Sequence, residues 1–152
     1  MYIQAMPRRS PLDKKIDRIA GECLGMRARR VDRAVSAIYN ELFAELGVKL
    51  SQLNVLIAVG KLEPARPAEV ARGLALEGST LSRNADRLRA RGYLDVLQGE
   101  DARSVRYQLT AAGRELIQDA YPLWVEAQRR VRDLLGSSGA DALLAFSPTA
   151  RD

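Results

Sequence analysis

The sequence predicts a mainly α-helical fold with one small β-hairpin, and three observations support this prediction. Apolar residues recur at helical spacing over long segments near both ends of the chain. Two shorter helical patterns in the middle are separated by only a few residues, which include a glycine. Next come two runs in which apolar and polar residues alternate, as in β-strands, and these runs flank a short polar turn. We therefore expect long terminal helices around a compact central lobe.

A long helix is predicted over residues 16–47, and it would span about 45 Å at 1.5 Å per residue. Gly21 and Gly25 each weaken its early part by roughly 1 kcal/mol relative to alanine, so a bend or break is expected there. A helix of this length needs a partner for its apolar stripe. The stripe consists of Ile16, Ala20, Cys23, Val31, Val35, Ile38, Leu42 and Leu46.

Two helices are predicted in the first half of the central lobe. The first covers 51–59, with Ser51 as its N-cap and Gly60 at its end. The second begins at Pro67 and carries Val70 and Leu74 four residues apart. A short glycine-containing connection to the next helix then completes a helix-turn-helix.

The next helix, expected from an N-cap at Ser79, has one apolar and one polar face. Leu81, Ala85 and Leu88 follow each other at steps of four and three, which predicts a buried stripe. The other positions can donate hydrogen bonds to phosphate oxygens or base edges, and they sit near the helix start that DNA-reading helices place in the major groove. These positions are Ser79, Thr80, Ser82, Arg83, Asn84 and Arg87. Double-stranded DNA is therefore the predicted partner.

A β-hairpin is predicted from Tyr93 to Leu109, around a polar tip over residues 98–103. Arg103 in this tip is the residue expected to reach a minor groove, as the arms and wings of DNA-binding proteins do. Asp101 either shapes the turn or pairs with an arginine of the preceding helix. Helix-turn-helix followed by hairpin is the order of a winged helix-turn-helix.

The C-terminal part, residues 110–147, predicts a second long helix that has Thr110 as its N-cap. Pro122 removes one backbone hydrogen bond, which predicts a kink near Gln118. Gly136 is expected to end this helix before a last short one.

Three local motifs resemble the multiple antibiotic resistance regulator (MarR) family of winged-helix transcription factors. They are Arg-Gly-Tyr-Leu at 91–94, Asp-Ala-Arg at 101–103 and Leu-Thr-Ala-Ala-Gly at 109–113. The resemblance runs from about Ile16 to Leu135. It implies a homodimer, interlocked through its terminal helices, that holds two recognition helices roughly 34 Å apart on a pseudo-palindromic operator. It also implies release from DNA by a ligand or an oxidant.

Two sensors are possible, and each has a purely structural alternative. Cys23 is either an inert apolar residue or an oxidant sensor whose thiolate Arg27 stabilises. The hydroperoxide-sensing branch of the resembled family carries a reactive cysteine close to this place. Four aromatic residues either pack in the core or line a pocket for a small aromatic effector. They are Tyr39, Phe43, Tyr121 and Trp124.

Composition narrows the classes of function. The 152 residues carry a net charge of +5 and give a pI near 9.7, which favours a polyanionic partner. The chain has no histidine and one cysteine, and its carboxylates do not cluster at metal-binding spacing, so we expect no enzyme, no metal site and no cofactor. We expect no membrane span and a cytoplasmic location.

The predicted organisation has three parts. Residues 1–15 form a flexible basic arm, 16–147 a single domain and 148–152 a tail. Within the domain, 16–47 and 110–147 are dimerisation helices and 51–109 is the winged-helix DNA-binding lobe. The predicted function is a homodimeric, DNA-binding transcriptional repressor released by a small molecule or an oxidant. The alternative is a winged-helix module that binds proteins.

Overall fold

The computed structural model describes residues 10–99 and 104–146. The chain forms two compact units, Met1–Val35 and Ser36–Asp152. The boundary between them falls inside the expected first dimerisation helix rather than at residue 15. The physical reason is that α2 (Leu24–Phe43) has its buried residues, Tyr39 and Phe43, only in its second half.

The first unit contains α1 (Pro11–Glu22) and the first part of α2. A reciprocal cap begins α1: Asp13 N donates to Ser10 Oγ at 3.1 Å, and Ser10 N donates to Asp13 Oδ2 at 2.7 Å. Residues 11–15, expected in a flexible arm, are therefore helical. The predicted break lies at Cys23, where ψ is 108°. Arg27 Nη2 bridges this break by donating to the Gly21 carbonyl oxygen at 3.0 Å.

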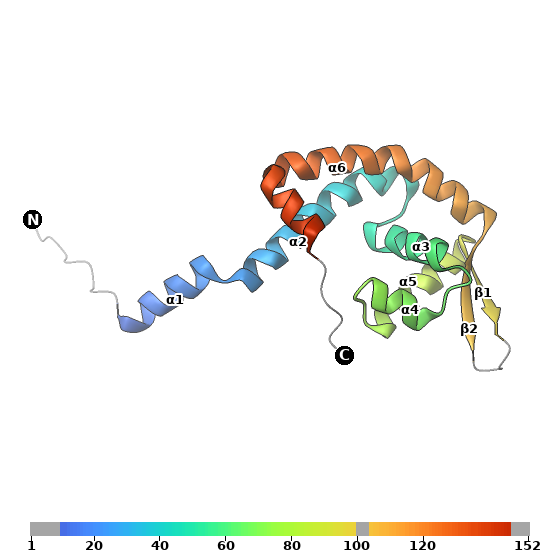
Figure 1. Cartoon of the computed structure of the whole chain (residues 1–152), viewed down its shortest axis with the longest axis horizontal. Helices are drawn as coiled ribbons and strands as arrows, with labels where there is room; N and C mark the ends of the chain where they lie inside the picture. The colour runs from blue at the N-terminus through green and yellow to red at the C-terminus, as the bar shows by residue number, and fades with distance from the viewer. Residues whose placement is uncertain (1–9, 100–103, 147–152) are drawn as a thin grey trace, which may run out of the picture. The chain divides into compact units, whose positions relative to one another are not determined.

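In the second unit, α2 ends in the short 3-10 helix η1 (Ala44–Leu46) and the chain turns at Gly47, whose φ is +66°. Three helices follow, and Figure 1 shows them grouped beneath α6: α3 (Leu50–Leu62), α4 (Pro67–Gly73) and α5 (Gly78–Ala90). Their shared core includes fully buried Leu56, Val70 and Leu88.

Helix α3 starts earlier and ends later than predicted. Lys49 occupies its N-cap position, and Lys49 N donates to Gln52 Oε1 at 3.0 Å. Gly60 lies inside the helix, where an added Cβ would meet Leu109 Cδ1 at 2.9 Å. The glycine at this position permits close packing of α3 on the hairpin and does not end the helix.

The hairpin pairs β1 (Leu94–Gln98) with β2 (Val105–Leu109), antiparallel, with Leu94 opposite Leu109. Ala65 forms an isolated bridge to Tyr107 on the other edge of β2. A two-stranded hairpin is marginal alone. Here the buried Leu94 and Leu109 attach it to the helices.

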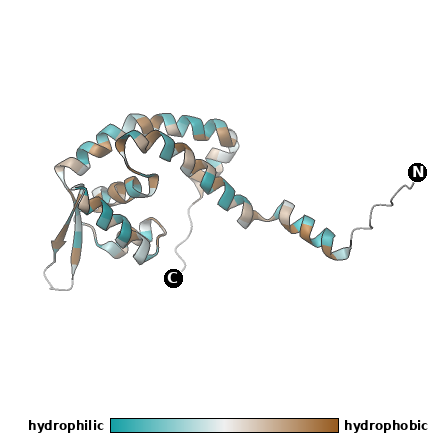
Figure 2. Ribbon diagram, turned by 180° about the vertical axis from the view of Figure 1, so that it is seen from behind, coloured by the Kyte–Doolittle hydropathy of each residue, from teal (hydrophilic) through white to brown (hydrophobic). Residues whose placement is uncertain are grey.

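Helix α6 (Ala111–Ala145) covers this lobe, and apolar and polar residues alternate along it (Figure 2). Thr110 Oγ1 accepts a hydrogen bond from Gly113 N at 3.0 Å, which confirms the predicted cap. The backbone leaves helical values at Gly136, with φ 70° and ψ 164°, as predicted. Around Pro122 and Gln118 no such departure occurs within the described helix.

The predicted fold class is confirmed: the protein is mainly helical with one antiparallel hairpin. Among the described residues no single helix is long and apolar enough to cross a membrane. Leu24–Leu46 and Leu50–Leu62, bent by 80° at their junction, meet that test only as a pair.

Candidate nucleic-acid interface

Helix α5 presents most of the predicted polar side chains to solvent. Leu81, Ala85 and Leu88 form its buried stripe, as their spacing predicted. Away from this stripe lie exposed hydroxyl and guanidinium groups that can bind phosphates or base edges. The exposed residues are Ser79, Thr80, Ser82, Arg83 and Arg87.

Asn84 does not belong to this exposed set. Only 7% of its surface is exposed, so its predicted place on the outer face is wrong. It lies three residues after Leu81 and four before Leu88, which is the spacing of the buried stripe. The polarity of its amide suggested an outer position, but helical geometry determines the face.

The start of α5 is two residues earlier than predicted. Glu77 holds the N-cap position, and its carbonyl oxygen accepts the amides of Thr80 and Leu81, each at 3.0 Å. Ser79 is therefore in the first turn and not the cap. The connection from α4 is short because Ala75 adopts φ +51°, a left-handed conformation that turns the chain sharply.

The exposed face of α5 carries uncompensated positive charge. Arg83 Nε donates to the Ser79 carbonyl oxygen at 3.3 Å, a contact within the same helix. Neither Arg83 nor Arg87 forms an ion pair with a carboxylate of the described residues. Two guanidinium groups on one helix face can thus bind an external anion without first breaking a salt bridge.

Arg91 fixes the other end of α5, a role that the sequence reasoning missed. Its guanidinium donates to the Gly47 carbonyl oxygen and, at 3.3 Å, to that of Leu46, and it lies 5.0 Å from the ring centre of Tyr93. These contacts attach the C-terminus of α5 to the turn after α2. No local pattern revealed them, because 44 residues separate Arg91 from Gly47.

The hairpin lies next to α5, as a wing should. Tyr93 N donates to the Leu88 carbonyl oxygen at 3.0 Å, so β1 begins where α5 ends. The predicted groove-reaching Arg103 and the turn residue Asp101 lie outside the described residues. Their roles stay predictions.

Comparisons with known proteins agree with this geometry. The MarR family model matches residues 46–104. A cysteine-to-serine mutant of MarR from E. coli, solved in complex with operator DNA, superposes with a TM-score of 0.75; it is 22% identical, over 84% of this chain and 92% of that chain.

A transcriptional regulator of M. tuberculosis, MosR, solved in complex with DNA, is 30% identical over 83% of this chain and 100% of that chain, with a TM-score of 0.64. The chain belongs to the MarR family of winged-helix transcriptional regulators. BpsR of Bordetella bronchiseptica, described with the regulation of its DNA binding by 6-hydroxynicotinic acid, is 24% identical over 81% of this chain and 94% of that chain, with a TM-score of 0.73. No curated protein sequence matches this chain significantly.

The MarR-family chain also has an apolar cavity of about 310 Å³ between α3 and α6. Tyr121 and Trp124 stack at its edge, with ring centres 5.8 Å apart and planes at 20°. Leu53, Ile57 and other apolar side chains form its walls, and Asn54 supplies a polar group. Such a site suits a small flat ligand that places one polar group near the amide.

The other two predicted pocket aromatics do not line this cavity. Phe43 is fully buried and Tyr39 nearly so, and their rings pack 5.8 Å apart. Tyr39 OH donates to Gln128 Oε1 at 3.0 Å, and burial raises the pKa of this phenol. Their placement in a common pocket with Tyr121 and Trp124 is therefore wrong. They join α2 to α6.

Cys23 lies half-buried at the break between α1 and α2. Cys23 thus lies at the break expected between Gly21 and Gly25. Arg27, expected to stabilise the thiolate, uses Nη2 to bind the Gly21 carbonyl oxygen. The redox role of Cys23 stays a prediction.

Proposed function

We propose that this MarR-family protein is a homodimeric repressor that binds pseudo-palindromic operator DNA and is released by a small-molecule or oxidant signal. The observation that carries the proposal is the exposed face of α5, where Arg83 and Arg87 have no carboxylate partner among the described residues. On this proposal α5 reads the major groove and Arg103 enters a minor groove. The operator complexes of E. coli MarR and M. tuberculosis MosR support DNA as the partner. Binding to DNA also supports the cytoplasmic location.

Exposed apolar side chains on the terminal helices support the homodimer. Large apolar groups left in water favour association, and single-chain proteins rarely display many of them together. A second copy of the chain would cover them, with 16–47 and 110–147 as dimerisation helices and 51–109 as the DNA-binding lobe. The exposed residues are Leu12, Ile16, Ile19, Leu24 and Met26 before residue 36, and Val125, Leu134, Leu143, Leu144 and Phe146 in and after α6.

The cavity between α3 and α6 supports the small-molecule signal. It is lined by α3, the first helix of the DNA-binding lobe, and by α6, which is proposed to dimerise. A ligand changes DNA affinity only if it binds the DNA-bound and free forms differently. The regulation of BpsR by 6-hydroxynicotinic acid supports an aromatic acid as the first class to try.

The decisive experiment is a gel-shift titration on the intergenic DNA beside the gene, with unrelated competitor DNA at two salt concentrations. We expect tight, salt-sensitive binding that survives the competitor. Arg87→Ala should weaken it while size-exclusion chromatography still gives a dimer. Arg89→Ala is the matched control. Arg89 lies two residues after Arg87, which is roughly 200° around the same helix, so its side chain points to another side.

Equal binding to operator and competitor would favour the alternative, a winged-helix module that binds proteins. The two signals are separated by Cys23→Ser. Loss of peroxide release in this variant would identify oxidant sensing, whereas unchanged release by an aromatic acid would assign the signal to the cavity.

A further inference from the structure

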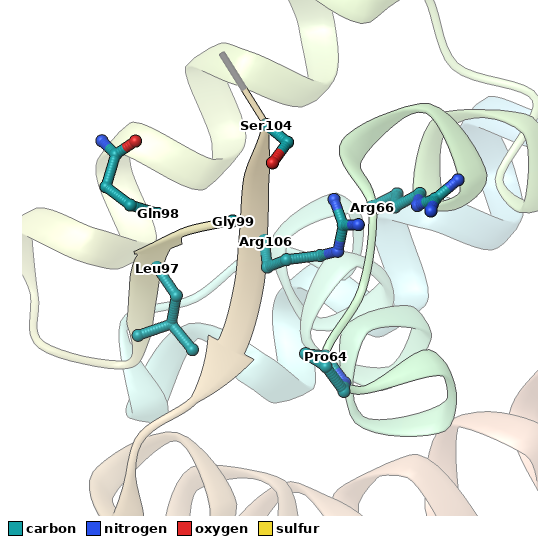
Figure 3. A pocket seen from close by; sticks show the side chains of 7 residues that line it. All are labelled: Pro64, Arg66, Leu97, Gln98, Gly99, Ser104 and Arg106. Carbon is teal, nitrogen blue, oxygen red and sulfur yellow. The ribbon is translucent and has the colours of Figure 1, made fainter. Parts of the chain in front are cut away.

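A second positively charged site lies beside the hairpin, outside α5. A cavity of about 780 Å³ is bounded by the end of β1, the start of β2 and the loop that precedes α4 (Figure 3). Arg66 from the loop and Arg106 from β2 are its charged residues. Leu97, opposite Arg106 on β1, gives it an apolar side.

An isolated bridge brings the backbone at the two arginines close together. Ala65 and Tyr107 exchange two backbone hydrogen bonds, of 2.9 Å from Ala65 N and 2.8 Å from Tyr107 N. Arg66 and Arg106 are the residues next to this isolated bridge, one on each segment. Because side chains alternate between faces, both arginines project away from buried Ala65 and Tyr107.

Neither guanidinium forms an ion pair within the described part of the chain. Arg106 Nη1 donates to the Val105 carbonyl oxygen at 3.2 Å, and the nearby Glu69 carboxylate accepts the backbone amide of Arg66 at 3.3 Å. An anion bound between or beside the two groups would therefore meet guanidinium charges that no carboxylate of the described residues neutralises.

Figure 3 shows how the two arginine side chains lie. Arg106 extends from β2 toward the loop, and the Arg66 side chain extends along the other side of this loop. Arg66 is exposed and Arg106 half-buried, so the first can turn toward a ligand that the second already faces. Planar guanidinium groups match the oxygens of a phosphate and can each donate two hydrogen bonds to it.

We propose that Arg66 and Arg106 form a cross-strand seat for a backbone phosphate of DNA beside the wing. This inference rests on the proposed DNA-binding function. It adds a contact that positions the wing and reads no base, because phosphate contacts fix register and orientation and carry no sequence information. DNA is favoured over a free anion because the seat belongs to the same lobe as the exposed cationic face of α5.

The test compares Arg66→Ala, Arg106→Ala and the double variant with Lys61→Ala, which removes an exposed charge on α3. DNA affinity is measured against salt concentration on a duplex without operator sequence and on the candidate operator. Each single variant should flatten the slope of log affinity against log salt by about two units, one for each protomer of a dimer. The slope of Lys61→Ala should stay that of the native protein.

Thermal stability separates this role from a structural one. Because neither guanidinium forms an ion pair among the described residues, the alanine variants should melt no lower than the native protein, and Arg66→Glu should bind DNA more weakly than Arg66→Ala. A lower melting temperature in all variants, or unchanged salt slopes, would overturn the seat. If slopes stay unchanged but inorganic phosphate raises the melting temperature of the native protein alone, the ligand is a small anion and the DNA assignment is wrong.

The two proposals fail in different ways. Native protein that binds operator and competitor equally would contradict the proposed repressor function. The seat would still stand if its variants flattened the salt slope on the duplex without operator sequence.

Discussion

Substitution of Gly113 tests how closely α6 packs on the base of the wing. An added Cβ would lie 2.2 Å from the Tyr93 carbonyl oxygen and 3.1 Å from its carbonyl carbon. Both backbones are held in place, since Gly113 N donates to Thr110 Oγ1 at 3.0 Å and Thr110 N donates to the Tyr93 carbonyl oxygen at 3.3 Å. The contact can be relieved only if α6 and the hairpin move apart.

The expected change in the free energy of unfolding has the opposite sign to that of a glycine-to-alanine substitution in an ordinary helix. Replacing a helical glycine by alanine usually stabilises a protein by roughly 0.5–1 kcal/mol. Overpacking of this kind costs about 1–3 kcal/mol, so Gly113→Ala should lower the free energy of unfolding by about 1–2 kcal/mol. Gly73→Ala is the matched control: nothing lies within 4 Å of its added Cβ, and it should raise this free energy by up to about 1 kcal/mol.

Urea titration followed by circular dichroism, at one fixed protein concentration, measures both variants. Operator affinity of Gly113→Ala should fall as well, because the wing is displaced. A Gly113→Ala protein as stable as the native one would show that α6 does not approach Tyr93 so closely, and the reasoning would be wrong.

Three further outcomes are expected. Thr110→Ala removes the acceptor for Gly113 N and a 2.6 Å hydrogen bond to the Gly92 carbonyl oxygen, and should cost about 1–2 kcal/mol in urea titrations; no loss would contradict the cap. Phe43→Ala empties a fully buried site and should cost about 3–5 kcal/mol, whereas a loss under about 1 kcal/mol would place this ring outside the core. Hydrogen bonds from Arg129 and Arg130 lower the pKa of Glu126 from 4.5 to about 2. Its stabilising contribution is thus present above pH 4.5 and lost as pH falls toward 2, so Glu126→Gln should flatten the decline of melting temperature in that range; an unchanged decline would refute this.

Features set by neighbouring residues were predictable from the sequence. The buried stripe of α5 follows from Leu81, Ala85 and Leu88, and the cap of α6 follows from Thr110. Both depend on spacing within a turn or two of helix. The position of Asn84 was predictable on the same grounds, had its spacing from Leu81 been weighed above its polarity.

Features set by distant parts of the chain were not predictable. The attachment of Arg91 to Gly47 and the pairing of Ala65 with Tyr107 each join segments more than 40 residues apart. The same holds for the aromatic residues. Phe43 and Trp124 both lie among apolar residues at helical spacing, and only tertiary packing buries Phe43 and leaves Trp124 39% exposed at the cavity.

The position of Trp124 gives the protein an internal optical probe. It is the single tryptophan of the chain, and it lies on the wall of the cavity between α3 and α6. Light absorbed at the red edge of the indole band therefore excites this one side chain in each protomer. A molecule that enters the cavity would displace water from the indole and change its emission wavelength, so occupancy can be followed in unlabelled protein and separately from any effect on DNA.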